Sequence, residues 1–174
     1  MMNRILIFGN SGSGKSWLSR EISKQENLSE INLDSIFWMP GGFSQKRSNE
    51  EVEIKINELK SLESWVVEGV FGGLVENFIT EATEVIFLDF SWEECSENLL
   101  YRGSGSSKKL DPEVAEIKYK ELLQWASEYW TRKSKSSHSF HNFLYESFKG
   151  RKQRITGREE VSSYLLFSNS TTGA

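Results

Sequence analysis

The stretch GNSGSGKS, residues 9–16, decides the expected fold of this chain. It matches the pattern G-x-x-x-x-G-K-[ST], whose glycines let backbone N–H groups converge on one point. An apolar run, RILIF (4–8), precedes the motif, and a helical pattern follows from Lys15, so the motif joins a buried strand to a helix. Backbone amides and a helix N-terminus attract phosphate, Lys15 suits the β- and γ-phosphates, and Ser16 suits Mg²⁺. We predict that a nucleotide triphosphate contacts Gly9, Asn10, Ser11, Gly12, Ser13, Gly14, Lys15, Ser16 and Trp17.

The whole chain has the composition of one globular domain. It has 174 residues, of which 26% are charged, and its net charge is -4. The chain contains no apolar run of the roughly 18 residues that a membrane helix needs, so we expect no membrane contact. The single cysteine, Cys95, cannot form an internal disulfide and fits a reducing compartment, which predicts a cytoplasmic protein.

Short apolar strands alternate with amphipathic helices along the chain. This alternation predicts an α/β fold with a parallel sheet covered by helices on both faces. In such sheets ligands bind at the carboxyl ends of the strands. The predicted strands are RILIF (4–8), INLD (31–34), WVVEG (65–69), VIFLDF (85–90) and KQRIT (152–156).

Four stretches resemble the adenylate-kinase-like small P-loop kinases, and most of all the branch known as topology modulation proteins, or FlaR-like putative kinases. The stretches are IFGNSGSGKSWLSREIS (7–23), INLDSIFW (31–38), WVVEGVFGGLVENF (65–78) and EVIFLDFSWEECSENLLYR (84–102), with a weaker echo in KQRITGREEVSSYL (152–165). The resemblance implies a three-layer P-loop NTPase fold in one domain over residues 1–174, with a five-stranded parallel sheet of order 2-3-1-4-5. It also implies an acceptor-side insert at about 35–64 and a helical lid at about 102–149.

The chain departs from that branch on the acceptor side. Ser35 stands where a second acidic residue is usual, and Glu68-Gly69-Val70-Phe71 replaces Asp-Gly-Asn-Tyr. Glutamate keeps the charge of aspartate on a longer arm. The loss of Asn and Tyr means that the branch's acceptor is not carried over to this chain.

Three carboxylates follow or end the predicted strands. Asp34 ends the second strand, where it can orient or deprotonate an acceptor hydroxyl, or else cap a helix. Glu68 and Asp89 end the third and fourth strands, and either one suits the water shell of Mg²⁺ that Ser16 would share. For each of these three carboxylates, the alternative to a functional role is a structural role in helix capping.

Two arginines are candidates for stabilising the transferred phosphoryl group. Arg102 opens the glycine- and serine-rich break RGSGSSKK (102–109), and the resemblance makes it the first arginine of the lid. Arg132 lies beyond the long helical pattern that Asp111-Pro112 begins and is a second lid candidate. A cation at a helix C-terminus also has a purely structural explanation.

These features predict ATP- and Mg²⁺-dependent phosphoryl transfer to a small-molecule acceptor, and the residues do not distinguish ATP from GTP. A slow NTPase with a moving lid is another interpretation. The alternative from a different class is a nucleotide-binding regulatory module associated with DNA. It is based on the acceptor-side departures and on the basic cluster KGRKQR (149–154), although the cluster lacks the aromatic residues of a nucleic-acid site. We expect His138 and His141 to be structural because no further ligand has metal-site spacing with them.

Overall fold

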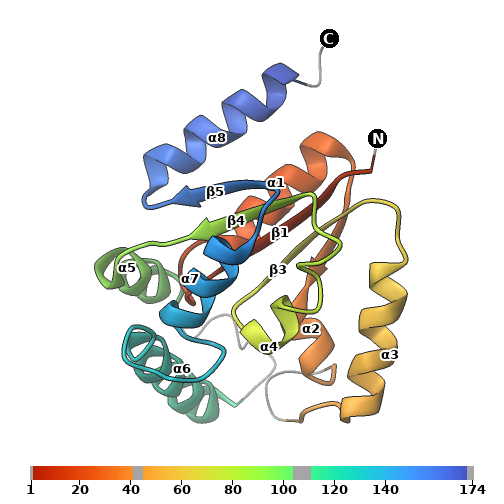
Figure 1. Cartoon of the computed structure of the whole chain (residues 1–174). Coiled ribbons are helices and arrows are strands. Elements are labelled where there is room, and N and C mark those ends of the chain that lie inside the picture. Colours follow the sequence, from red (N-terminus) through yellow and green to blue (C-terminus); the bar gives the residue numbers. More distant parts are fainter. Residues whose placement is uncertain (1, 41–44, 104–110, 172–174) are drawn as a thin grey trace.

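The computed structural model describes residues 2–40, 45–103 and 111–171, with side chains to residue 167. Five strands form one parallel sheet in the order β2-β3-β1-β4-β5, as predicted (Figure 1). They are β1 (Arg4–Gly9), β2 (Ser29–Asn32), β3 (Trp65–Gly69), β4 (Glu84–Leu88) and β5 (Arg151–Ile155). The central position of β1 places its carboxyl end, where the glycine-rich loop begins, between those of β3 and β4.

Helices cover both faces of the sheet. They are α1 (Lys15–Glu26), α2 (Leu33–Phe37), α3 (Asn49–Lys60), α4 (Gly72–Val75), α5 (Trp92–Arg102), α6 (Pro112–Ser127), α7 (His138–Ser147) and α8 (Arg158–Thr171). Alternate β1 residues face opposite sides, as a strand buried on both faces requires. Ile5 and Ile7 pack with α1, α5 and α8, whereas Leu6 and Phe8 pack with α2, α3, α4 and α7. The three-layer architecture is therefore confirmed.

Side-chain caps mark where most helices begin. Ser48 and Glu51 form a complete capping box at the start of α3. Ser91 and Asp111 cap α5 and α6, and Pro112 occupies the first turn of α6. Each cap satisfies an N–H group that has no partner inside its helix.

The strand predicted at 31–34 is wrong at its carboxyl end. β2 stops at Asn32, whose side-chain Oδ1 accepts a hydrogen bond from the Asp34 N–H at 2.8 Å and so begins α2. An asparagine at this position favours a helix start over a further extended residue. Asp34 therefore lies in the first turn of α2.

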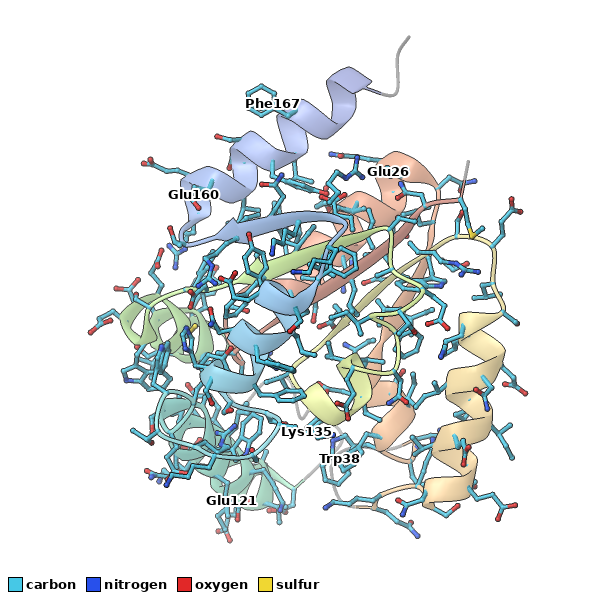
Figure 2. All side chains as sticks on the ribbon, viewed as in Figure 1. Glu26, Trp38, Glu121, Lys135, Glu160 and Phe167 are labelled. Carbon is cyan, nitrogen blue, oxygen red and sulfur yellow. The ribbon has the colours of Figure 1, made fainter. Side chains whose placement is uncertain are left out.

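The outer surface carries several large apolar side chains. Phe167 is 74% exposed, and Figure 2 shows it on the outer side of α8, pointing away from the sheet. Trp17, the third residue of α1, is 53% exposed. Within the residues that the structure describes, no helix has the length and apolar character needed to cross a membrane.

Candidate phosphoryl-transfer site

The glycine-rich loop turns from β1 into α1 with backbone angles that favour glycine. Gly12 and Gly14 have φ of +83° and +90°. Gly14 is the N-cap of α1, no side chain caps this helix, and its first turn contains no acidic residue. Among the described residues, no side chain caps the first N–H groups of α1, so these groups and the positive end of the helix dipole suit phosphate.

Lys15 lies inside the loop instead of extending into solvent. It is 8% exposed, and its Nζ donates to the main-chain oxygen of Asn10 at 2.7 Å. Burial lowers the pKa of Lys15, while the carboxylates of Glu68 and Asp34 oppose that shift. The ammonium group thus lies where it acts on both acidic side chains from neighbouring segments.

Glu68 is the carboxylate that meets the loop directly. The register pairs it with Ile7 of β1, and its Oε1 accepts a hydrogen bond from Ser16 Oγ at 2.8 Å. Glu68 is 3% exposed, and burial raises its pKa, with Lys15 and the Ser16 hydrogen bond opposing the shift. Two hard oxygen atoms lie together beside the loop, and these are atoms that Mg²⁺ prefers.

Gly69 has a packing role that the sequence did not reveal. A Cβ there would lie 2.8 Å from Leu33 Cδ1, so Gly69 allows α2 to pack on the end of β3. That packing sets the distance of the first turn of α2 from β3.

Asp34 is partly buried in that turn, and one of its carboxyl oxygens is fully enclosed. Among the described residues, its Oδ1 is buried and has no hydrogen-bond partner. Burial raises its pKa, and the positive charges of Lys15 and Arg102 oppose the shift. Capping of α2 is performed by Asn32, which leaves the carboxyl group of Asp34 without that structural role. An unsatisfied buried carboxyl oxygen is costly, and its retention is typical of a site that meets a ligand.

Asp89 takes part in a different cluster from Glu68. Its Oδ1 lies 2.9 Å from His138 Nε2, and its Oδ2 accepts from Arg154 Nη1 at 2.9 Å. Arg154 also contacts Glu146 at 3.0 Å. Both oxygens of Asp89 therefore have protein partners that join β4, β5 and α7, which sequence reasoning missed because the partners lie 49 and 65 residues away.

The two predicted arginines occupy different surroundings. Arg102 is the last residue of α5, and its charge acts on both Lys15 and Asp34. The described contacts of Arg132 are with the end of α6 and with the α6–α7 connection: its guanidinium stacks 3.8 Å from the Trp125 ring centre and donates to the Ser136 oxygen at 2.6 Å. The structure thus brings Arg102, but not Arg132, into electrostatic contact with the loop lysine.

Aromatic rings extend from α2 towards α6. Phe37 lies one helical turn after Asp34, and its ring centre is 4.8 Å from that of Phe71. Phe71 in turn lies 6.0 Å from Trp125. Phe71 and Trp125 had no sequence signal as members of this group, because α6 and the β3–α4 connection meet only in the folded chain.

The histidines have the structural role that the sequence suggested. His141 is fully buried between Tyr129 Oη at 2.7 Å and the Val70 oxygen at 3.0 Å, and burial lowers its pKa to about 3. Within the described residues, no group of three or more His, Cys, Asp or Glu side chains gathers as a metal cage. This fits Mg²⁺, which commonly uses one or two carboxylates plus phosphate oxygens.

The described pockets lie elsewhere. A cavity of about 230 Å³ between β2, α2 and α3 is lined by residues that include Asn32, Ser35 and Lys55. Lys15 and Asp34 are not among its lining residues. The candidate site is defined here by its side-chain contacts around the loop.

Comparisons with known proteins agree with this architecture. No family model matches the chain, and no curated protein matches its sequence. Among solved structures, a gluconokinase from Sinorhizobium meliloti 1021 superposes with a TM-score of 0.56 at 16% identity, covering 98% of this chain and 93% of that one. A shikimate kinase from Acinetobacter baumannii in complex with shikimate gives 0.55 at 16% identity, covering 100% and 97%.

A third solved structure extends the likeness to another kind of kinase. The deoxyadenosine kinase from M. mycoides with bound dATP gives a TM-score of 0.51 at 14% identity, covering 98% of this chain and 100% of that one. At such low identities the likeness concerns the fold, and the three kinases differ in the acceptor that their names give. The chain has the fold of the small P-loop kinases.

Proposed function

We propose that this protein transfers the γ-phosphoryl group of ATP, with Mg²⁺, to a hydroxyl group of a small molecule. The observation that carries the proposal is the meeting of Lys15, Glu68 and Asp34 at the carboxyl ends of β1, β3 and β2. A motif for phosphate binding alone does not require a second, unsatisfied carboxyl group on the acceptor side. A kinase does, because the acceptor hydroxyl must be oriented and give up its proton.

The phosphate side of the site would be formed by the loop. The amides at the start of α1 and the Lys15 ammonium would hold the β- and γ-phosphates. Ser16 Oγ and Glu68 would hold Mg²⁺, directly or through water, and Asp89 is the weaker candidate because His138 and Arg154 occupy its oxygens. The bound ion would supply positive charge to the phosphate oxygens during transfer.

The acceptor side would be formed by α2 and the end of α5. Asp34 would accept the hydroxyl proton, which its raised pKa favours. Arg102 would neutralise the charge that develops on the transferred group, as arginines do in phosphoryl transfer. Within the lid proposed at 102–149, α7 packs on the core through Leu144, so α6 is the part that we assign to lid movement.

The contacts of the basic cluster favour a kinase over a DNA-associated regulatory module. Arg151 pairs with the buried Glu84, Lys152 donates to the Tyr145 oxygen at 3.0 Å, and Arg154 pairs with Asp89. Side chains held in this way are not arranged as an open stripe for phosphate backbones, which is what nucleic-acid affinity needs.

A direct test measures ADP release from Mg-ATP in the presence of nucleosides, deoxynucleosides, shikimate, gluconate and small polyols. The expected result is release that depends on one class of acceptor and is lost in Lys15→Ala. Lys24→Ala, on the exposed side of α1, is the matched control for removing a lysine from this helix and should retain the activity. Acceptor-independent ADP release would indicate a slow NTPase instead. Salt-sensitive binding to duplex DNA without any transfer would favour the regulatory module.

The nucleotide itself is tested by thermal shift. ATP and GTP are compared at equal concentrations with Mg²⁺, because a ligand that binds the native state raises its melting temperature. The proposal expects a larger rise with ATP than with GTP and no rise with either in Lys15→Ala. An equal response to GTP would change the donor assigned to the site.

A further inference from the structure

Asn10, the first residue after β1, has a buried side chain that is hydrogen-bonded within the protein. It is 1% exposed, and its Nδ2 donates to the main-chain oxygen of Ala126 at 3.0 Å. Its Oδ1 accepts from the Ser11 N–H at 2.8 Å. Both halves of the carboxamide are thus used within the protein, one on the glycine-rich loop and one on α6.

The main chain of the same residue organises the loop. The Asn10 oxygen accepts hydrogen bonds from Lys15 Nζ at 2.7 Å and from Ser13 Oγ at 2.8 Å. Any change in the placement of Asn10 therefore moves the partner of the lysine that is proposed to bind phosphate. The position of Asn10 is in turn tied to α6 through Ala126.

Ala126 lies in the last turn of α6, a part of the molecule with several contacts of its own. Ala126 is fully buried, and its oxygen also accepts from the Tyr129 N–H at 3.3 Å. The neighbouring Trp125 contacts Phe71 on the acceptor side. The end of α6 therefore touches the phosphate loop through Asn10 and the acceptor-side connection through Trp125.

We propose that Asn10 is a positioning residue that couples the glycine-rich loop to the end of α6, so that nucleotide binding and the packing of α6 depend on one another. This inference rests on the nucleotide site of the proposed function. Its physical content is reciprocal: if α6 holds the loop in the conformation that binds phosphate, then bound nucleotide must stabilise the end of α6 by the same free energy.

A second asparagine provides the matched control. Asn98 on α5 donates to the Gly12 oxygen at 2.7 Å and accepts from Arg158 at 2.6 Å. It is bonded to the same loop through the same chemical group, but it connects the loop to α5 and α8. Removal of either side chain should weaken nucleotide binding, whereas only Asn10 should transmit nucleotide binding to α6.

The experiment compares wild type, Asn10→Ala, Asn10→Asp and Asn98→Ala. Mg-ATP affinity is measured by calorimetry, and amide hydrogen exchange of residues 126–132 is measured with and without Mg-ATP. Asn10→Ala should bind Mg-ATP about five- to tenfold more weakly, the effect of a lost buried hydrogen bond. In wild type and Asn98→Ala, Mg-ATP should slow exchange at 126–132, and in both Asn10 variants this response should disappear.

The variant Asn10→Asp separates coupling from folding. It keeps the size of the side chain and an oxygen for the Ser11 N–H, but it cannot donate to Ala126. The added negative charge of Asn10→Asp alters Mg-ATP affinity for a separate reason, so the affinity of this variant is not used. If Asn10→Ala does not fold, the exchange response of Asn10→Asp alone decides.

The coupling is overturned if Asn10→Ala binds Mg-ATP as tightly as wild type, or if exchange at 126–132 still responds to Mg-ATP in the Asn10 variants. Neither readout requires catalysis. A protein that binds Mg-ATP but transfers phosphate to no acceptor would refute the kinase and leave the coupling in place. A wild type that binds no Mg-ATP refutes both.

Discussion

Two glycines of the glycine-rich loop, Gly12 and Gly14, allow a sharp test of the loop conformation. Both have positive φ, so alanine at either position costs about 1–2 kcal/mol of backbone strain. Their surroundings differ. A Cβ on Gly12 would lie 2.4 Å from the Cys95 main-chain oxygen and 2.9 Å from Leu99 Cγ, whereas a Cβ on Gly14 would meet no heavy atom of the described residues within 4 Å.

Besides the backbone strain, steric overpacking applies to Gly12 alone. Overpacking against a buried backbone adds about 1–3 kcal/mol, so Gly12→Ala should lower the free energy of unfolding by about 2–5 kcal/mol and Gly14→Ala by about 1–2 kcal/mol. For a chain of this size, each kcal/mol shifts the melting temperature by about 2–4 °C. Gly12→Ala should therefore melt several degrees below Gly14→Ala.

Urea unfolding of the nucleotide-free proteins, followed by circular dichroism, measures the difference directly. Gly73→Ala is a suitable reference, because among the residues that the structure describes a Cβ there would contact only Lys135 Cδ, at an ordinary 3.8 Å. Equal stability of Gly12→Ala and Gly14→Ala would falsify the close packing of the loop on α5. An unfolding curve with more than one transition would require separate fits for each step.

Further predictions concern ionisable groups. Asp34→Asn should reduce the turnover number by about 10²–10⁴-fold, which is the usual contribution of a general base. The Mg-ATP dissociation constant measured by calorimetry should change little, and an unchanged turnover number would remove Asp34 from catalysis. Burial raises the folded-state pKa of Asp34 above its ordinary value of 3.8, so the protonated carboxyl group stabilises the fold at low pH and this stabilisation is lost as the pH rises through the folded-state pKa. Asp34→Asn should therefore gain stability relative to wild type at pH 7.5 compared with pH 4. Urea titrations showing the opposite sign would contradict the burial assigned to Asp34. His141 is neutral in the fold because burial lowers its pKa from 6.5 to about 3, so it favours unfolding as the pH drops below 6.5. Between pH 6.5 and 4 this lowers the free energy of unfolding by about 3 kcal/mol, and His141→Gln should remove that loss. An unchanged pH dependence of stability would show that another group is responsible.

Much of the fold was predictable because its signals are local. The buried run at 4–8, the glycine spacing of 9–16 and the capping box at Ser48 each depend on residues that are close in sequence. The sheet order came from the resemblance to P-loop kinases, and the structure confirms it. The end of β2 was misplaced because the capping role of Asn32, two residues before Asp34, was overlooked.

The candidate site was less predictable from the sequence than the fold, because its geometry depends on tertiary structure. Glu68 and Asp89 look alike in sequence, since each carboxylate lies at or just beyond the end of a buried strand. Only the sheet register places Glu68 beside Ser16, and only the packing of α7 and β5 gives Asp89 its partners His138 and Arg154. Side-chain identity therefore supplied the candidates, and the packing of distant segments separated them.

The sequence by itself determined that residues 9–16 form a glycine-rich turn between a strand and a helix, because glycine φ angles act within eight residues, and it predicted anion binding there from the converging backbone amides. Tertiary structure alone decided which groups surround that turn. The hydrogen bond from Asn10 to Ala126 spans 116 positions of the chain, and no local pattern marks it. Such a contact exists because helices and strands pack their apolar faces together, and that packing brings polar groups from remote segments within hydrogen-bonding distance.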